Sequence, residues 1–205
     1  MGQEIVEEMA SQIGVRFLDF SIEGVRNVWS KTPVAGLEDL KGLKMRVPEV
    51  PMFINTFQAL GVNPTPMATS EVYTGLQTNI VDGLEYDVTG VIDQNFVDHC
   101  KYCYETKHSV SIMAFGVAEN FWNNLTEEQR EIIRTAAEEI SAELNETYYE
   151  KAKADRETLE EQGITLVAPT EAESEEIKEL MEPIILDYIK DYATKEDLDA
   201  LKAIP

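Results

Sequence analysis

Short apolar runs alternate with segments of helical periodicity through the first 125 residues of the chain. PMFINTFQALG at 51–61 predicts a helix with Pro51 in its first turn and Gly61 at its end, and Ser70 is placed to cap the next helix. Three runs on either side of these segments have the length and composition of strands: VRFLDF at 15–20, LKMRVP at 43–48 and SIMAFGV at 111–117. Strands that alternate with helices in this way predict an α/β fold.

The chain becomes helical and strongly acidic after residue 125. Thr126-Glu-Glu-Gln129 forms a capping box, and Gly163 is placed to end the helix that it opens. The apolar residues between them recur with the helical period, which predicts one long amphipathic helix: Ile132, Ile133, Ala136, Ala137, Ile140 and Leu144.

A short strand and two further helices are expected in the rest of the chain. ITLVAP at 164–169 has the composition of a strand, and Thr170-Glu-Ala-Glu173 is a second capping box. Pro183 predicts a kink in the helix that follows. Thr194 is placed to cap a last short helix that ends at Pro205.

The charge of the chain excludes several classes of function. The sequence has 39 Asp and Glu against 17 Lys and Arg, a formal net charge of −22, and no cluster of basic residues. Nucleic-acid binding and attachment to anionic membranes both require such clusters, so neither is expected. No apolar run reaches the roughly 20 residues that cross a bilayer. MGQEIVEEMA at the N-terminus lacks the basic start and apolar stretch of a signal peptide.

The stretch HCKYCYETKH brings two cysteines and two histidines together: His99, Cys100, Cys103 and His108. A zinc site usually draws on two separated ligand pairs, and a thioredoxin-type pair opens a helix after a strand. This stretch fits neither pattern well, although both readings stay open. We interpret the cysteines as small side chains beside a strand, linked by a disulfide if the compartment is oxidising, and predict no metal site.

The sequence contains none of the common catalytic motifs. GxSxG, GxxxxGK[ST], HExxH and a GxGxxG after a strand are all absent, and no pair of carboxylates stands out among so many. We therefore predict a protein that is not an enzyme, with no catalytic residue and no cofactor.

Two arginines in the α/β portion are candidates for binding an anion. Arg46 lies in LKMRVP at the end of a predicted strand, and Arg26 follows the strand VRFLDF. Ligands of α/β proteins usually bind at strand ends, and a guanidinium can hold a carboxylate through two parallel hydrogen bonds. The alternative is that each arginine pairs with a structural Asp or Glu.

Four segments around these arginines carry a resemblance to a known family. DLKGLKMRVP at 39–48, ALGVNPTPM at 59–67, SEVYTGLQT at 70–78 and VDGLE at 81–85 resemble the substrate-binding proteins of tripartite ATP-independent periplasmic (TRAP) transporters, of the dicarboxylate-receptor type. FWNNLTEEQREII at 121–133 is similar to the start of the long helix of that family, and the likeness follows nearly the whole chain in the same order.

The resemblance implies a periplasmic-binding-protein-like fold of two α/β lobes that close on a small organic acid. The arginine that binds the ligand carboxylate in the family matches Arg46, and a second arginine matches Arg26. Tyr86 stands where the family has an asparagine that faces the ligand, and Thr69 stands where many members have an aromatic residue. Both departures suit a hydroxylated acid, such as a sugar acid.

The resemblance also implies that the first lobe of the family is largely missing. We expect an α/β ligand-binding lobe with hinge strands over residues 1–125, and a long helix, short strand and C-terminal helices over 126–205. Without its partner lobe the chain is expected to bind ligand weakly or not at all. The surface left by that lobe could support a homo-oligomer.

The family implies a periplasmic or other extracytoplasmic location and TRAP membrane subunits as partners. Two alternatives stay open from the sequence. The same fold could serve as the ligand-sensing or interaction module of another system, or the chain could be a fragment without binding activity of its own.

Overall fold

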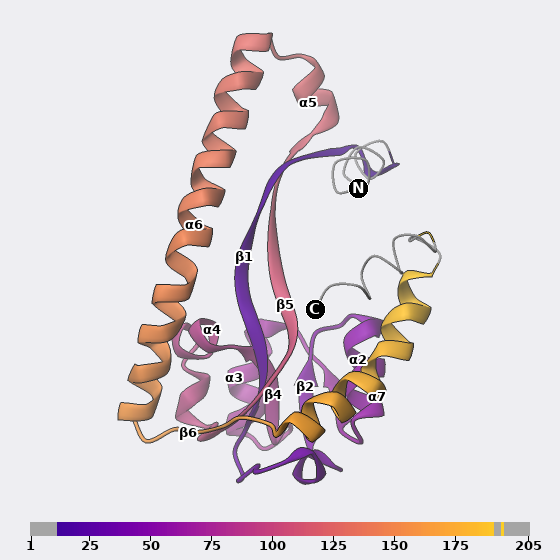
Figure 1. The fold of residues 1–205 in the computed structure, drawn as a ribbon, viewed down its shortest axis with the longest axis vertical. Helices are drawn as coiled ribbons and strands as arrows, with labels where there is room; N and C mark the ends of the chain where they lie inside the picture. The colour runs from indigo at the N-terminus through magenta and orange to yellow at the C-terminus, as the bar shows by residue number, and fades with distance from the viewer. Residues whose placement is uncertain (1–11, 191–193, 195–205) are drawn as a thin grey trace. The chain divides into compact units, whose positions relative to one another are not determined.

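The computed structural model describes residues 12–190 and Thr194 (Figure 1). Contacts within the chain divide it into two compact units. Unit 1 comprises Met1–Gly24 and Val110–Lys153, and unit 2 comprises Val25–Ser109 and Ala154–Pro205. Each unit contains residues from both sides of position 125, so the division into 1–125 and 126–205 remains a proposal about domain organisation.

A mixed sheet with the strand order β3-β2-β4-β1-β5-β6 forms the centre of unit 2, which confirms the α/β prediction. Strand β2 is parallel to β3 and β4, β4 is antiparallel to β1, and β5 is parallel to β6. The strands are β1 (Val15–Ser30), β2 (Lys44–Val47), β3 (Asn63–Pro66), β4 (Gly83–Asp87), β5 (Tyr102–Ala118) and β6 (Thr165–Val167).

Helices cover both faces of this sheet. Neighbouring residues of one strand point to opposite faces, and Val28 and Trp29 of β1 belong to two different hydrophobic clusters. The cluster of Val28 includes residues of α2 (Pro51–Ala59) and α7 (Glu171–Ile189), and that of Trp29 includes residues of α3 (Thr69–Gln77) and α4 (Val88–Asp93). The short 3-10 helices η1 (Leu37–Leu40) and η2 (Phe96–Asp98) complete unit 2.

Most predicted helix boundaries are confirmed. Helix α2 starts at Pro51, and Gly61 follows it with a positive φ of 78°. Helix α6 (Glu127–Glu161) begins with the reciprocal hydrogen bonds of Thr126 and Gln129, and α7 begins with the Thr170–Glu173 capping box. Helix α7 continues without a break through Pro183.

Two local predictions are wrong. Ser70 does not cap α3, because the helix starts at Thr69, two residues earlier than predicted, and its N-cap residue Ala68 provides no side-chain cap. Strand β1 does not end near Phe20 but continues to Ser30, so Arg26 lies within the strand rather than after it. The predicted helix after Thr194 lies outside the described residues.

Unit 1 contains the first half of β1, the second half of β5, α5 (Glu119–Asn123) and most of α6. Gly14 O accepts a hydrogen bond from Glu119 N at 2.8 Å, which ties the beginning of β1 to the end of β5. Buried Trp122 has three guanidinium groups within 6 Å of its ring centroid, those of Arg16, Arg130 and Arg134. The predicted apolar stripe of α6 is largely uncovered, since Ala137 is buried but Ile132 is 64% exposed.

Candidate functional site

A cluster of buried charged side chains lies where β2, β4 and β1 come together in unit 2. Arg46 is the third residue of β2, Glu85 lies in β4, and Arg26 lies opposite Asp87 in the antiparallel pairing of β1 with β4. Because β2 and β4 are parallel, their carboxyl ends meet at one edge of the sheet. The arginine predicted at a strand end is therefore found there, beside a carboxylate with no exposed surface.

Arg26 contacts a carboxylate along one edge of its guanidinium and has two aromatic rings close to it. Its Nε donates to Glu85 Oε2 at 2.5 Å, and its Nη2 donates to Glu85 Oε1 at 2.7 Å. The rings of Tyr86 and Phe53 lie 4.8 and 5.6 Å from its Cζ. Burial alone lowers the pKa of Arg26, but the hydrogen bonds and charge of Glu85 outweigh this effect and raise it. Arg26 thus pairs with a structural acid, which was the alternative to ligand binding that the sequence left open for it.

Arg46 is held differently and keeps a donor without an acceptor. Its Nε donates to the carbonyl oxygen of Met67 at 2.9 Å, and its Nη2 donates to Thr69 Oγ1 at 3.1 Å. Its Nη1 is buried with no hydrogen-bond partner in the described part of the chain, and Glu85 Oε1 is 3.9 Å away. Burial lowers the pKa of Arg46, and the charge of Glu85 opposes this only in part. The positive charge of Arg46 is therefore poorly compensated.

His108 of β5 completes the cluster. Its side chain is 1% exposed, and its Nε2 lies 3.5 Å from Glu85 Oε2. Its Nδ1 shares a hydrogen bond with the Thr106 hydroxyl at 2.7 Å, and its ring meets Phe57 edge-on. Glu85 therefore faces three side chains that can carry positive charge.

The remaining members of the stretch HCKYCYETKH lie elsewhere. The ring of His99 packs against Tyr73, and Cys100 and Cys103 are buried free thiols. Burial raises the pKa of Cys100 to about 12 and raises that of Cys103. Across the described residues, no group of three or more His, Cys, Asp or Glu side chains is arranged to hold a metal ion.

The two other predicted site residues both contact an arginine. Thr69, the first residue of α3, accepts the hydrogen bond from Arg46. The Tyr86 ring covers Arg26 and also meets Phe96 edge-on at 5.8 Å. Gly90 makes room for this ring, because a Cβ there would lie 2.1 Å from Tyr86 Cε1. The structure thus brings Arg26, Arg46, Tyr86 and Thr69 into one network around Glu85.

Sequence reasoning named neither Glu85 nor His108 as a site residue. Glu85 belongs to the VDGLE segment, which carried the resemblance, but it is one of 39 acidic residues. His108 belongs to the stretch HCKYCYETKH, whose pattern suggests metal binding, and the sequence offers no Ser or Cys partner for it in a catalytic triad. Both residues lie on strands close to a buried arginine. That proximity could indicate a site, but it can be recognised only once the order of the strands in the sheet is known.

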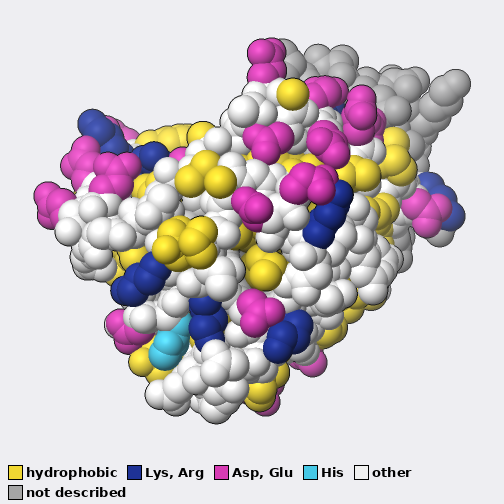
Figure 2. All heavy atoms as spheres, turned by 90° about the horizontal axis from the view of Figure 1, so that it is seen from below, with side chains coloured by type: hydrophobic (Ala, Val, Ile, Leu, Met, Phe, Trp, Pro, Cys, Tyr) yellow, Lys and Arg dark blue, Asp and Glu magenta, His cyan; other side chains and the backbone are white. Residues whose placement is uncertain are grey.

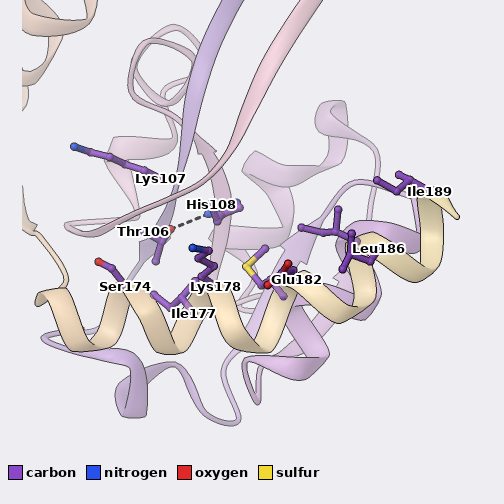
Figure 3. Close-up of a pocket in the computed structure, with 11 residues that line it drawn as sticks. Thr106, Lys107, His108, Ser174, Ile177, Lys178, Glu182, Leu186 and Ile189 are labelled. Carbon is purple, nitrogen blue, oxygen red and sulfur yellow. Dashed lines mark hydrogen bonds between the residues drawn. The ribbon is translucent and has the colours of Figure 1, made fainter. Parts of the chain in front are cut away.

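A cavity of about 630 Å³ lies between the Thr106–His108 segment of β5 and helix α7 (Figure 3). Its α7 wall is mainly aliphatic, with Ile177, Met181 and Ile185, and carries Lys178 and Glu182 as well. His108 is the member of the charged cluster that lines this cavity, and Arg46 and Thr69 are outside its lining. The cavity therefore touches the charged cluster at His108 but does not include Arg46 or Thr69.

Charged and apolar side chains alternate on the face of the molecule that Figure 2 shows. Figure 2 shows one face, on which acidic side chains and single Lys and Arg side chains are interspersed with apolar ones. The described residues on this face form no continuous basic surface. In the described ranges, no helix has the length and apolar character needed to cross a membrane.

Comparison with known proteins finds one matching family and several relatives. The model of the family described as bacterial extracellular solute-binding protein, family 7, matches residues 1–191. A solute-binding protein of Roseobacter denitrificans is 35% identical over 167 residues, which are 82% of this chain and 51% of the relative. The sialic acid-binding periplasmic protein SiaP of Vibrio cholerae is 30% identical over 187 residues, which are 91% of this chain and 57% of the relative.

Two solved structures extend this similarity to the fold. The structure of the Roseobacter denitrificans protein, a TRAP periplasmic solute-binding protein with bound L-galactonate, has a TM-score of 0.81 and 32% identity. The similarity extends over 95% of this chain and over 63% of the Roseobacter denitrificans protein. A TRAP periplasmic solute-binding protein of Xanthobacter autotrophicus with bound β-D-galacturonate has a TM-score of 0.86 and 26% identity. The similarity extends over 97% of this chain and 64% of that protein. The chain thus spans between half and two thirds of the length of each of these relatives.

Proposed function

Because the chain belongs to family 7 of the bacterial extracellular solute-binding proteins, we propose that it captures a small organic acid for a TRAP transporter. The family consists of binding proteins, and the proposal assigns the chain binding without catalysis. In this proposal it works outside the cytoplasmic membrane and delivers its ligand to the TRAP membrane subunits.

The observation that supports this proposal is the state of Arg46. A buried guanidinium nitrogen without a hydrogen-bond acceptor is costly, and a ligand carboxylate supplies both an acceptor and a negative charge. The lowered pKa of Arg46 points the same way, because it shows that burial outweighs the compensating charge around this group. An anion bound at Arg46 would supply both the missing hydrogen-bond acceptor and the missing negative charge.

A sugar acid is the class of ligand that we favour. L-galactonate and β-D-galacturonate, bound by the two solved relatives, each combine one carboxylate with several hydroxyl groups. Thr69 gives this chain a hydroxyl group next to Arg46 that can exchange hydrogen bonds with such a ligand, and the Tyr86 ring beside Arg26 carries a second hydroxyl group.

In this proposal Arg26 acts together with Glu85. Its guanidinium binds both carboxylate oxygens of Glu85, so it neutralises an acid that would otherwise repel the ligand carboxylate. Arg46 then remains as the cation that attracts the ligand.

Binding of D-galacturonate, D-glucuronate and L-galactonate to the 205-residue chain tests the proposal, with D-galactose as the neutral control. We expect the acids to bind and galactose not to bind, in calorimetry and in ligand-observed NMR extended to millimolar ligand. Binding of galactose as tight as that of the acids would contradict the proposal.

Substitution Arg46→Lys tests the assignment of the anchor. The lysine keeps the charge but cannot hold Met67 O and Thr69 while it also donates to a ligand, so affinity for the acid should fall about tenfold or more. Arg134→Lys is the matched control, because Arg134 pairs with Glu131 on the surface of α6 and should leave affinity unchanged. Equal affinity of Arg46→Lys and wild type would show that the anchor lies elsewhere.

A further inference from the structure

Lys107 has a backbone conformation that is unusual for a residue inside a strand. It lies within β5, but its φ is 47°, in the left-handed region. The other described residues besides glycine with a positive φ are Asn79 and Asn95, and asparagine adopts this region more readily than lysine. One kind of β-bulge places its first residue, usually a glycine, in this region and bends the strand. The backbone at Lys107 is therefore strained.

The amide of Lys107 is bound by a side chain of the neighbouring strand. Asn27 of β1, the strand next to β5, accepts a hydrogen bond from Lys107 N through its Oδ1 at 3.1 Å. The same side chain donates from its Nδ2 to the carbonyl oxygen of Val25 at 3.3 Å. Asn27 is 3% exposed, so water has little access to these two bonds. One buried side chain thus joins β1 to β5.

These contacts lie where both strands leave unit 2. On β1 the unit begins at Val25, and on β5 it ends at Ser109, two residues after Lys107. On the other side of Lys107, buried Glu105 forms an ion pair with Arg156 of α6, which also belongs to unit 2. Lys107 is therefore the strained position between the anchored part of β5 and the part that continues into unit 1.

Two backbone states of similar free energy are expected at such a position. While the hydrogen bond to Asn27 is formed, Lys107 is held in the left-handed region, and when that bond opens, Lys107 can relax to the extended conformation of a strand. The lost hydrogen bond and the relieved strain then oppose each other. Both bonds of Asn27 are longer than the usual value of about 2.9–3.0 Å, which favours opening.

We propose that Asn27 and Lys107 form a clamp on β1 and β5, and that opening of this clamp lets β5 turn at Lys107. Because β5 continues beyond Ser109 into unit 1, the turn changes the direction in which the strand enters that unit. The clamp is a conformational device of the chain itself. It goes beyond the proposed function, because it needs no ligand.

Two substitutions with opposite expected effects test the clamp by amide hydrogen exchange in the 205-residue chain. Asn27→Leu removes the acceptor, so exchange of the residue 107 amide should become about fivefold faster. Lys107→Gly should slow this exchange about fivefold, because glycine adopts the left-handed region without strain and favours the closed clamp. Asn63→Leu is the control: it removes a bond from Asn63 Nδ2 to Gly42 O at an exposed position of unit 2 and should leave the exchange unchanged.

Relaxation-dispersion NMR tests whether the two strands move together. In wild type we expect the amides of residues 26 and 107, whose peptide groups contact Asn27, to report one process with a common rate. Lys107→Gly should suppress this process at both positions.

Separate rates at the two positions, faster exchange in Lys107→Gly, or unchanged exchange in Asn27→Leu would each overturn the clamp. Lys107 is exposed, so Lys107→Gly should fold and decides the question even if Asn27→Leu does not fold. No ligand enters these measurements, so failure of the clamp leaves the proposed function standing.

Discussion

At Glu85, one carboxylate with no exposed surface faces Arg26, Arg46 and His108. Both of its oxygens accept hydrogen bonds from Arg26, and its distances to the other two side chains are longer than hydrogen bonds. A buried charge is tolerated when it is paired with good geometry, and removal of one partner leaves the other charge uncompensated. The pair of Arg26 and Glu85 is therefore the part of the cluster on which folding depends.

Substitution Glu85→Gln should destabilise the chain by about 3–5 kcal/mol, because Arg26 stays buried without its counter-ion. Urea denaturation followed by circular dichroism measures this change. Glu131→Gln is the matched control: it breaks an ion pair with Arg134 at the surface, which should cost less than about 1 kcal/mol. Equal losses in the two variants would show that the buried pair contributes no more than an exposed one.

The sequence was sufficient to single out Arg46 but not its surroundings. Arg46 stands out because it follows apolar residues in a predicted strand of a chain with few cations. Its partners depend on which strands lie side by side, and Arg26 and Glu85 are separated by 59 positions in the chain. Local patterns carry no information on such a pairing, so Glu85 and His108 were missed and Arg26 was placed outside its strand.

Among the elements, those governed by local interactions were predicted best. Helices α2, α6 and α7 carry their start signals in neighbouring residues, namely Pro51 and the boxes at Thr126 and Thr170. Strand β1 was predicted too short because its second half pairs with β4 and is nearly all buried, so it lacks the alternation that marks a half-exposed strand.

The capping box of α7 also joins this helix to η1. Glu173 Oε2 accepts a hydrogen bond from Thr170 N at 2.9 Å, and its Oε1 accepts one from Leu37 N at 3.2 Å. These backbone and side-chain hydrogen bonds from Thr170, with that from Leu37, lower the pKa of Glu173 to about 2. The ionised form of Glu173 is therefore the form that stabilises this junction.

Substitution Thr170→Ala should cost about 1 kcal/mol at neutral pH, because a capping hydrogen bond is lost. The pKa of Glu173 in the folded chain is below its ordinary value of 4.5, so its contribution is complete above that pH and disappears as the pH falls through about 2. Urea denaturation across this range should show a smaller acid dependence in the variant than in wild type. Thr147→Ala, in the middle of α6, should leave that dependence unchanged, and an equal effect of both variants would contradict the role of the box.

On the scale of the whole molecule, apolar burial is concentrated in unit 2. Both hydrophobic clusters consist of unit 2 residues, and in the described part of unit 1 the buried hydrophobic residues are Trp122 and Ala137. The periodicity of α6 correctly predicted which apolar residues share one helix face. It could not predict that this face is exposed, because periodicity does not show what covers a face. Ile132, Ile140 and Leu144 are 64%, 47% and 40% exposed.

We predict that the chain associates with itself through the exposed stripe of α6. Apolar side chains grouped on one helix face favour burial between copies, whereas a net charge of −22 opposes close approach. Salt screens this repulsion, so the mass measured by size-exclusion chromatography with light scattering should rise with protein concentration and further with ionic strength.

Ile132→Glu combined with Ile140→Glu should return the chain to a monomer, whereas Thr135→Glu, at an exposed polar position of α6 outside the stripe, should not. A wild-type chain that stays monomeric at high salt and high concentration would refute the prediction, since screening would then have removed the charge repulsion between the copies.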